Sequence, residues 1–446
     1  MSNLDAQASI LPTKSSNFLT HQNNNYWKYY KLYDESVIKN NFSVISDSKT
    51  FLNNMKYVKN NRYIIYTSKK VFNVFDTKTN TYAVSINIDD FDVTKHEITH
   101  LKVTEPTTGE ITESDIFVTV VFENAESENN INSPYIIKIY NLSDILQNVT
   151  AQNTSNNTLK YHTMITVNDT SGKNKFPISC FEISNNLNVA LLGLGNGAVY
   201  LIRGDFKRDR GYRQRLIYKN LSHQMITNLR LVNNDKYAVM STIDYLLILS
   251  TDGVINDKQH LEKNFYKNIS NIEGANFNLI DINEWQKFMY VLNVDIIDVY
   301  DISNDFNKVE SFSISISNKA ANNLYLKCIN VSELIIVKQS NNSDDVIGSR
   351  TTTKATIIDV QNRITTSTTV FNNMVNEIIP TENGVIVILK SGTIHQFVKK
   401  DINNIVNLIL GGSNISDADY KLAIEILSHS SVGNNEAVIK KYGDYL

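Results

Sequence analysis

The most informative stretch of this chain reads Val189-Ala-Leu-Leu-Gly-Leu-Gly-Asn-Gly-Ala-Val-Tyr-Leu-Ile202. It holds two apolar runs joined at Asn196-Gly197, a dipeptide that accepts the positive φ angles of a type I′ turn. The two runs are therefore predicted to pair as a β-hairpin. Both runs are apolar at nearly every position, so a sheet built from them has to be covered on both faces.

Strand-like segments of this kind recur along the chain. They start near Phe51, Glu97, Phe176, Met225, Gly274, Asn323 and Met374. The last five starts lie about fifty residues apart, which is typical of propeller blades. The longer interval from 97 to 176 contains polar insertions at 105–115, 124–133 and 143–158, which we expect to lengthen loops without adding a blade.

Each repeating unit has room for four strands, and the runs 237–251, 288–300 and 384–397 each supply two of them. Seven such sheets bury both faces only when they are stacked radially, so the sequence predicts a mainly β fold, a seven-bladed β-propeller. In a closed ring the first and last strands must meet, and Trp27–Tyr33 is the predicted closing strand. A pair of β-sandwiches is the alternative architecture, which the regular spacing disfavours.

The periodicity changes from strand to helix near residue 400. The run 401–410 has helical spacing, and Ser416-Asp-Ala-Asp419 is typical of a helix cap. A second apolar stripe and a third helical segment follow before Leu446. We therefore expect a flexible N-terminal tail at 1–25, a propeller at 26–400, and the truncated start of an α-solenoid at 401–446.

Composition excludes several classes of protein. The net charge of the chain is −3, so no global field attracts it to nucleic acid or an anionic membrane. The polar N-terminus does not resemble a signal peptide, and no apolar run is long enough to span a bilayer. Cys180 and Cys328 lie in alternating apolar runs and are interpreted as buried free thiols. They form neither a disulfide framework nor a zinc site.

Candidate catalytic and ligand-binding motifs have simpler interpretations. Gly193-Leu-Gly-Asn-Gly197 precedes a strand rather than a helix, so we interpret it as a hairpin turn rather than a nucleotide loop. His96 and His100 lie four residues apart in a predicted strand, where they are expected to share one face, but metal binding there is disfavoured. We expect no catalytic residue, no cofactor and no metal.

The hairpin continues into a cluster of alternating basic and acidic residues. Its candidate site residues are Arg203, Asp205, Arg208, Asp209, Arg210, Arg213 and Arg215. In one interpretation the arginines pair with Asp205 and Asp209 and pin a long loop across neighbouring blades. In the other the cluster is a docking surface for a protein partner, because Arg forms directional bonds at interfaces. Phosphoinositide or RNA contact is a weaker alternative, since a platform of interleaved aromatic residues is lacking.

The same segment resembles a signature of the class C vacuolar protein sorting subunits of the Vps-eleven (Pep-five) type. The matching runs are Leu201–Asp205, Arg208–Gly211 and Arg213–Tyr218. Further similarity lies at Tyr26–Tyr33 and Lys441–Leu446. The three central runs are specific, whereas the intervening strand pattern fits many propellers.

This resemblance implies a non-enzymatic scaffold subunit of the HOPS and CORVET complexes, which tether endosomes and vacuoles before SNARE-driven fusion. The implied partners are the other class C and HOPS/CORVET subunits, with Rab-type GTPases and SNAREs reached indirectly, and no nucleic acid. The implied location is the cytoplasm, peripheral on late endosome and vacuole membranes. The zinc-binding RING of that family lies at the far C-terminus, and its cysteines are not in this chain, so RING activity is not carried over.

Two other classes of function remain open at this point. A propeller-solenoid coat or nuclear-pore structural subunit would share the architecture, but the run 201–218 favours the tether. A propeller enzyme would need acids, bases or metal ligands that converge at one site, and the sequence does not show such a group.

Overall fold

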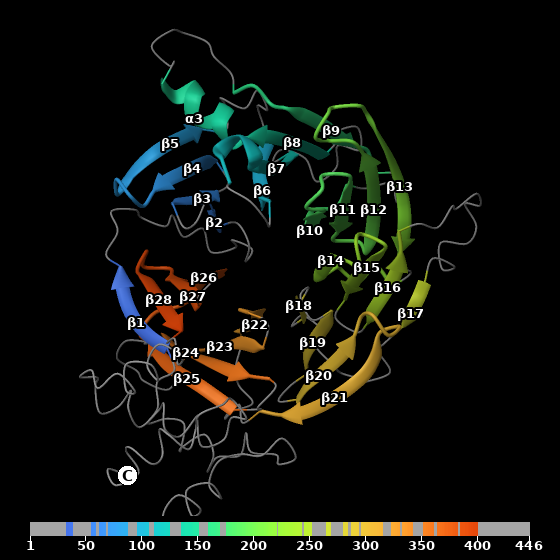
Figure 1. Ribbon diagram of the computed structural model, residues 1–446. Coiled ribbons are helices and arrows are strands. Elements are labelled where there is room, and N and C mark those ends of the chain that lie inside the picture. The colour runs from blue at the N-terminus through green and yellow to red at the C-terminus, as the bar shows by residue number, and fades with distance from the viewer. Residues whose placement is uncertain are drawn as a thin grey trace, which may run out of the picture. The chain divides into compact units, whose positions relative to one another are not determined.

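The fold is described over a defined set of residues. The computed structural model describes residues 33–38, 55–58, 62–67, 70–87, 96–106, 111–124, 135–150, 159–169, 175–220, 222–242, 245–251, 265–268, 280–283, 287–293, 296–314, 323–330, 332–341, 351–360, 364–381 and 384–399. The strands among them form seven four-stranded sheets (Figure 1). The protein is therefore mainly β, a seven-bladed β-propeller, as the sequence predicts.

The first four blades occupy residues 55–268. They contain β2 (Met55–Val58), β3 (Tyr63–Thr67), β4 (Val71–Asp76) and β5 (Thr81–Asn87); β6 (His96–Thr104), β7 (Phe117–Asn124), β8 (Tyr135–Asn141) and β9 (Thr163–Val167); β10 (Ile178–Ile183), β11 (Val189–Leu194), β12 (Ala198–Gly204) and β13 (Tyr212–Lys219); and β14 (Asn228–Val232), β15 (Tyr237–Ser241), β16 (Leu246–Ser250) and β17 (Phe265–Asn268).

The remaining three blades use strands from both ends of the described chain. They contain β18 (Ile280–Asn283), β19 (Phe288–Asn293), β20 (Ile296–Asp301) and β21 (Asn307–Ser313); β22 (Asn323–Cys328), β23 (Glu333–Asn341), β24 (Thr351–Asp359) and β25 (Ile364–Phe371); and β26 (Val375–Thr381), β27 (Gly384–Leu389), β28 (Ile394–Lys399) and β1 (Tyr33–Ile38). The first strand of every blade begins close to an expected start, and the largest difference is Gly274 against Ile280.

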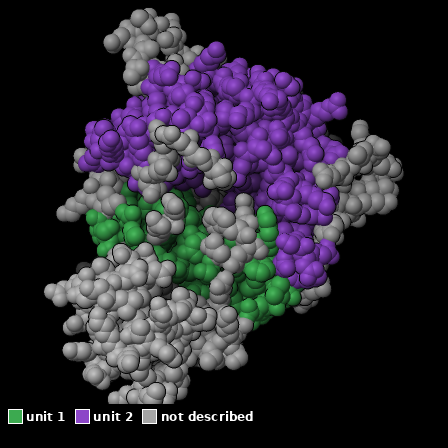
Figure 2. Space-filling model, in the orientation of Figure 1, with its two compact units in different colours: residues 1–39, 281–300, 308–446 green, residues 40–280, 301–307 purple. Residues whose placement is uncertain are grey.

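The chain divides into two compact units, shown in separate colours in Figure 2. One unit comprises residues 40–280 and 301–307 and contains the first four blades. The other comprises residues 1–39, 281–300 and 308–446 and contains the sixth and seventh blades.

The two central strands of the third blade, β11 and β12, are apolar on both faces because each face packs against a different neighbouring blade. The pleat sends alternate residues to opposite sides of a sheet. Leu191 and Leu201, which are opposite each other in the β11–β12 register, belong to a core shared with the fourth blade. Their neighbours Leu192 and Tyr200 belong to a core shared with the second blade. All six residues of β11 are buried in consequence.

The turn that joins β11 to β12 differs from the prediction. A type I′ turn needs positive φ at both central residues, but in this loop positive φ occurs at Gly197 (80°) and not at Asn196. The N–H of Gly197 donates to the carbonyl of Leu194 over 3.0 Å. The loop is therefore the three-residue type, a turn followed by one left-handed residue, and Gly197 supplies that residue.

The seventh blade is completed by a strand from the other end of the chain. β1 pairs antiparallel with β28, from Tyr33 opposite Lys399 to Ile38 opposite Ile394. The predicted closing strand, Trp27–Tyr33, ends where β1 begins, and residues 27–32 lie outside the described residues. The described strand lies further along the chain than predicted, and half of its six residues are polar, as is common for an edge strand.

A buried carboxylate joins this strand pair to the sixth blade. The side chain of Glu333, at the start of β23, is fully buried. Its Oε2 accepts hydrogen bonds from the Tyr33 hydroxyl at 2.5 Å, Asn330 Nδ2 at 2.5 Å and Lys399 Nζ at 2.9 Å. We call these four side chains the Glu333 clasp. They bind two strands of the seventh blade to the sixth by buried, charge-assisted hydrogen bonds.

One insertion contains a helix rather than loop alone. Between β8 and β9 the chain forms α3 (Leu142–Thr150), whose Leu142 and Ile145 are buried in the core of the first two blades. The helix packs beside β5 and the short 3₁₀ helix η2 (Glu113–Asp115) (Figure 1). The polar composition of 143–158 hid this helix and its anchor Ile145.

Two expectations about the ends of the chain concern residues outside the described set. They are the flexible tail at 1–25 and the α-solenoid start at 401–446. Within the described segments, no helix combines the length and apolarity needed to cross a bilayer.

Candidate functional site

The basic cluster lies on β12, on β13 and on the connection between them. We call residues 205–213 the arginine loop. Its backbone turns back on the carbonyl of Asp205, which accepts the N–H groups of Arg208 at 3.2 Å and Arg210 at 3.3 Å. Asp209 (φ 48°) and Gly211 (φ 86°) are both left-handed. Gly adopts that conformation freely and Asp tolerates it, which explains these two residue types within the turn.

The arginine loop is anchored to the second blade by Phe206. This side chain is buried in the core shared by the second and third blades. Its N–H donates to the carbonyl of Leu187 at 3.0 Å, and its carbonyl accepts from Thr163 Oγ1 at 2.7 Å. The next carbonyl, of Lys207, lies 2.6 Å from Nε2 of His162. A buried aromatic ring and main-chain hydrogen bonds therefore hold the loop.

Two of the clustered arginines contribute to the packing between the third and fourth blades. Arg203 Nη2 donates to the carbonyl oxygen of Thr251 at 3.0 Å and to its Oγ1 at 3.1 Å. Arg215 is half-buried and lies opposite the buried Leu201 in the strand register. Burial, and then the nearby Arg203, lower the pKa of Arg215 below its ordinary value. These two residues are parts of the fold.

The other arginines point to solvent. Arg208 and Arg210 are each about two thirds exposed, and their contacts to Asp205 Oδ2 are long, at 3.7 Å and 4.0 Å. Arg213 is exposed and lies directly opposite Arg203, a like charge, in the β12–β13 register. Among the described residues the ion pairs of the loop converge on Asp205, while Asp209 serves the turn. The structure thus divides the predicted cluster into Arg203 and Arg215, which bond or pack between blades, and an outward group of Arg208, Arg210 and Arg213.

A hollow of about 420 Å³ lies beside the arginine loop. Its lining residues are Asp144 and Gln147 of α3 and the consecutive Lys160, Tyr161 and His162. His162 belongs to both features, because its ring contacts the Lys207 carbonyl. Sequence reasoning missed this hollow, since it depends on the unexpected helix α3. A run of charged and aromatic residues immediately before β9 was the available signal.

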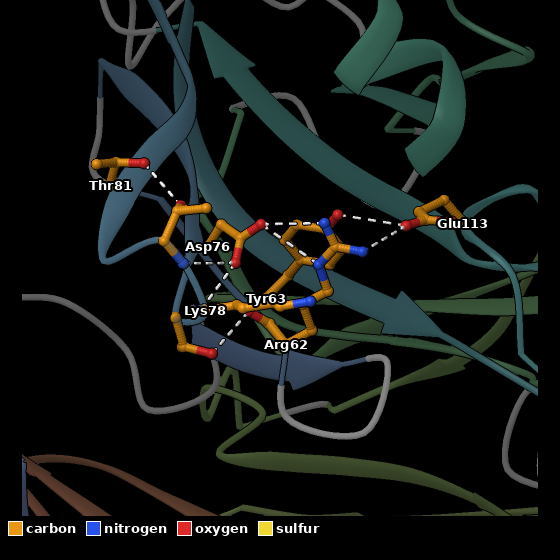
Figure 3. A network of polar contacts seen from close by, with 8 residues as sticks. Arg62, Tyr63, Asp76, Lys78, Thr81 and Glu113 are labelled. Atoms are coloured by element: carbon orange, nitrogen blue, oxygen red, sulfur yellow. Dashed lines mark hydrogen bonds and ion pairs between the residues drawn. The ribbon is translucent and has the colours of Figure 1, made fainter.

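A second polar network fastens the first blade to η2 (Figure 3). Arg62 donates to Asp76 Oδ2 from Nε at 3.3 Å and from Nη2 at 3.2 Å, and its Nη1 lies 3.5 Å from Glu113 Oε1. The Tyr63 hydroxyl donates to the same Glu113 oxygen at 3.3 Å. Burial is the main cause that raises the pKa of Tyr63 to about 12, so its hydroxyl remains a donor. The network holds neighbouring blades together.

A third network links the first strands of three consecutive blades. Glu182 on β10 accepts from Lys102 Nζ of β6 at 2.9 Å and from Arg230 Nη1 of β14 at 3.2 Å. Burial opposes ionisation of Glu182, but Lys102 and Arg230 outweigh it and hold the pKa of the carboxyl below its ordinary value. The carboxylate is therefore charged and acts as a buried link between cations.

His96, His100, Cys180 and Cys328 all lie in described strands. A β-bulge between Ile98 and His100 shifts the register, so His96 and His100 lie on opposite faces of β6, contrary to the prediction. Burial, and then Lys102, lower the pKa of His100 to about 4. Cys328 is buried and Cys180 half-buried, and both are free thiols. Among the residues that the structure describes, no three His, Cys, Asp or Glu side chains are grouped to hold a metal.

Comparison with protein families identifies the family of this chain. The family model described as PEP5/VPS11 N-terminal matches residues 27–398, a span that includes the hairpin, the arginine loop and the buried carboxylate of the Glu333 clasp. The chain belongs to the PEP5/VPS11 N-terminal family. No curated protein sequence is significantly similar to it.

Solved structures share the propeller architecture of this family member. A chain of the mitotic checkpoint complex has a TM-score of 0.50 at 10% identity, covering 83% of this chain and 93% of that one. The Cps50 (Swd1) β-propeller domain of Myceliophteria thermophila has a TM-score of 0.53 at 9% identity, covering 82% and 100%. At such identities the likeness concerns the fold alone.

Proposed function

We propose that this chain is a non-enzymatic scaffold subunit of a HOPS- or CORVET-type tethering complex. In that role it acts in vesicle docking and fusion and in protein transport to the vacuole, through contacts with other proteins. The observation that carries the proposal is the PEP5/VPS11 N-terminal match over residues 27–398. The resemblance at 201–218, in the same span, supports it independently of the strand pattern.

The architecture suits a scaffold. Buried carboxylates such as Glu182 and Glu333 fasten neighbouring blades, so the sheets form a firm support for exposed loops. Loops held on a rigid framework are the usual place for recognition. The proposed partners are the other class C and HOPS/CORVET subunits, with Rab-type GTPases and SNAREs reached indirectly. The proposed location is the cytoplasmic face of late endosome and vacuole membranes, where the chain is held peripherally through the complex.

Co-assembly tests this proposal directly. The chain is co-expressed with class C partner subunits, and the mixture is fractionated by size-exclusion chromatography with crosslink mapping. Co-elution with tether subunits in a defined stoichiometry supports the proposal. Co-elution with coat or nuclear-pore subunits instead, under the same conditions, contradicts it.

A functional exchange gives a second readout. Residues 1–446 replace the N-terminal propeller of a host cell's own family member, and vacuole fusion is scored by microscopy. Restored fusion supports the scaffold role. Intact expression with fragmented vacuoles contradicts it, provided that the exchange of the host's propeller for itself restores fusion.

A further inference from the structure

We propose that the arginine loop and the adjoining hollow dock an extended, acidic segment of a protein partner. The segment lays carboxylates over Arg208, Arg210 and Arg213 and places one polar side chain in the hollow. This inference deepens the proposed scaffold function and rests on it for the statement that the occupant is a protein.

The first observation is a local surplus of positive charge. The loop carries four basic side chains, Lys207, Arg208, Arg210 and Arg213, against two acidic ones, Asp205 and Asp209, which leaves two positive charges unbalanced. The chain as a whole has a net charge of −3, so this surplus is a local feature. A concentrated positive patch of this kind attracts an acidic partner and steers its approach.

The second observation is that the fold makes little use of the three exposed arginines, Arg208, Arg210 and Arg213. Exposed ion pairs as long as those of Arg208 and Arg210 to Asp205 contribute little to the stability of a fold. The like charges of Arg203 and Arg213, directly opposite on adjacent strands, work against pairing. Arg203 has its own place against Thr251. The charge of Arg213 therefore does not stabilise the pairing of β12 with β13.

The third observation is preorganisation. Phe206 is buried, the carbonyl of Asp205 closes the turn, and Thr163 and His162 hold the next two carbonyls. A loop already fixed in this way loses little conformational entropy when a partner binds. The planar forks of arginines on such a frame can meet carboxylates with directional, bidentate bonds.

The hollow defines where the segment continues. His162 joins it to the loop, and Lys160 extends the positive surface along its wall. Tyr161 is 39% exposed, and Lys138 lies 4.9 Å from the centre of its ring, which supports the ring from below. Asp144 on the wall disfavours a further carboxylate inside the hollow. A hydroxyl or amide side chain, flanked by acidic residues, fits this lining.

Nucleic acid fits this surface less well than protein does. Single-stranded recognition relies on aromatic rings that stack on bases. The loop has two aromatic side chains, Phe206, which is buried, and Tyr212, whose hydroxyl is held by Thr166 through three contacts of 2.8–3.0 Å. Neither ring is presented for stacking, and Tyr161 in the hollow is one exposed ring rather than a platform of several.

The test measures binding of a fluorescein-labelled oligoglutamate peptide to the full chain by fluorescence anisotropy, with an oligoglutamine peptide of equal length as reference. We expect the glutamate peptide to bind, and R208Q/R210Q/R213Q to weaken binding by at least about tenfold. The matched control carries the same change in net charge at Lys78, Lys287 and Lys390, each replaced by Gln. It should change binding by less than about twofold.

Further variants separate the alternatives. R208K/R210K/R213K keeps the charge but loses the forks, so peptide binding should still fall severalfold. The single change Lys160→Gln should weaken binding about threefold if the hollow takes part. Absence of peptide binding, or equal losses in the loop and control triples, overturns the inference. The last alternative is a membrane surface. If the chain and R208K/R210K/R213K both sediment with phosphatidylserine vesicles and the chain does not bind the peptide, the surface binds membrane and the inference is overturned.

This experiment is separable from the test of the proposed function. If the chain co-assembles with class C subunits but does not bind the acidic peptide, the docking inference alone is contradicted. If the chain binds the peptide but does not co-assemble, the proposed tethering function alone is contradicted. A melting curve of each triple variant confirms that any loss of binding occurs in a folded protein.

Discussion

The arginine loop and the Glu333 clasp use similar groups in opposite surroundings. At the clasp a fully buried carboxylate receives three hydrogen bonds of 2.5–2.9 Å. In the loop the Asp205 carboxylate is 31% exposed, and two arginines reach it only at 3.7 Å and 4.0 Å. Water competes for the second carboxylate but not for the first. Burial, rather than the number of opposite charges nearby, decides which cluster supports the fold and which stays available to a partner.

The strongest test of this contrast is Glu333→Ala. Removal of the carboxylate leaves the buried Tyr33 hydroxyl and the Asn330 amide without their shared acceptor, so we expect a loss of about 4 kcal/mol in the free energy of unfolding. Denaturant titration followed by circular dichroism measures it. Glu35→Ala, which removes the partly exposed partner of His395 on the same strand pair, should cost about 1 kcal/mol. Equal costs would contradict the role assigned to burial.

Phe206→Ala tests whether the arginine loop is anchored by its core residue. Loss of this buried ring leaves a cavity between two blades, with an expected cost of about 3 kcal/mol. Hydrogen exchange of the loop amides should speed up more than that of β11 and β12. The neighbouring exposed Arg208→Ala serves as the control, and a loop that stays protected in the Phe206 variant would argue against this anchor.

Glu182→Gln tests the buried contact of Glu182 with Lys102 and Arg230, whose contribution to stability should depend on pH. The folded-state pKa of Glu182 lies below the ordinary value of 4.5, so the charged form stabilises the fold above that pH and the benefit is lost as the pH falls through the folded-state pKa. We expect the variant to be less stable by about 2 kcal/mol at neutral pH. The difference should shrink in acid. A difference that is constant between neutral pH and strong acid would show that the charge of Glu182 is not what matters.

The smallest expected effect belongs to the exposed arginines. R208Q/R210Q/R213Q should change the free energy of unfolding by less than about 1 kcal/mol, because each exposed pair contributes little. Arg203→Gln alone should cost about 1 kcal/mol, since it removes the bonds to Thr251. Thermal melting of both variants gives the comparison. If the triple variant is less stable than Arg203→Gln, the three exposed arginines do contribute to the stability of the fold.

The period of the sequence predicted the blades because each sheet repeats the same burial problem. Apolar runs such as Val189–Leu194 need cover on both faces, and that need recurs in the second strand of other blades, such as β3, β15 and β27. The closing strand that the structure describes, Tyr33–Ile38, shares only Tyr33 with the predicted one, because an edge strand with polar residues gives a weak apolar pattern. The turn type was missed because the sequence shows Asn196-Gly197 but not where the strand ladder ends.

The candidate site was only partly predictable. The sequence shows the charges of the cluster, but their directions depend on the β12–β13 register, in which Arg215 falls opposite Leu201 and Arg213 opposite Arg203. A register shift between Val199 and Tyr200 sets this pairing, and composition does not reveal such a shift. The hollow was out of reach for a related reason, because its wall comes from α3, a helix within a polar insertion.

The pairing of β1 with β28 has a consequence for synthesis of the protein. Glu35 and His395, which contact each other at 2.9 Å, are separated by 360 positions along the chain. A ribosome must release nearly all of the described residues before the seventh sheet can acquire its fourth strand. Contacts between such distant positions form late, because closing so long a loop costs entropy before it is rewarded. Until then the outer edge of β28 stays unpaired in the nascent chain, which makes that edge the place where a chaperone would be needed.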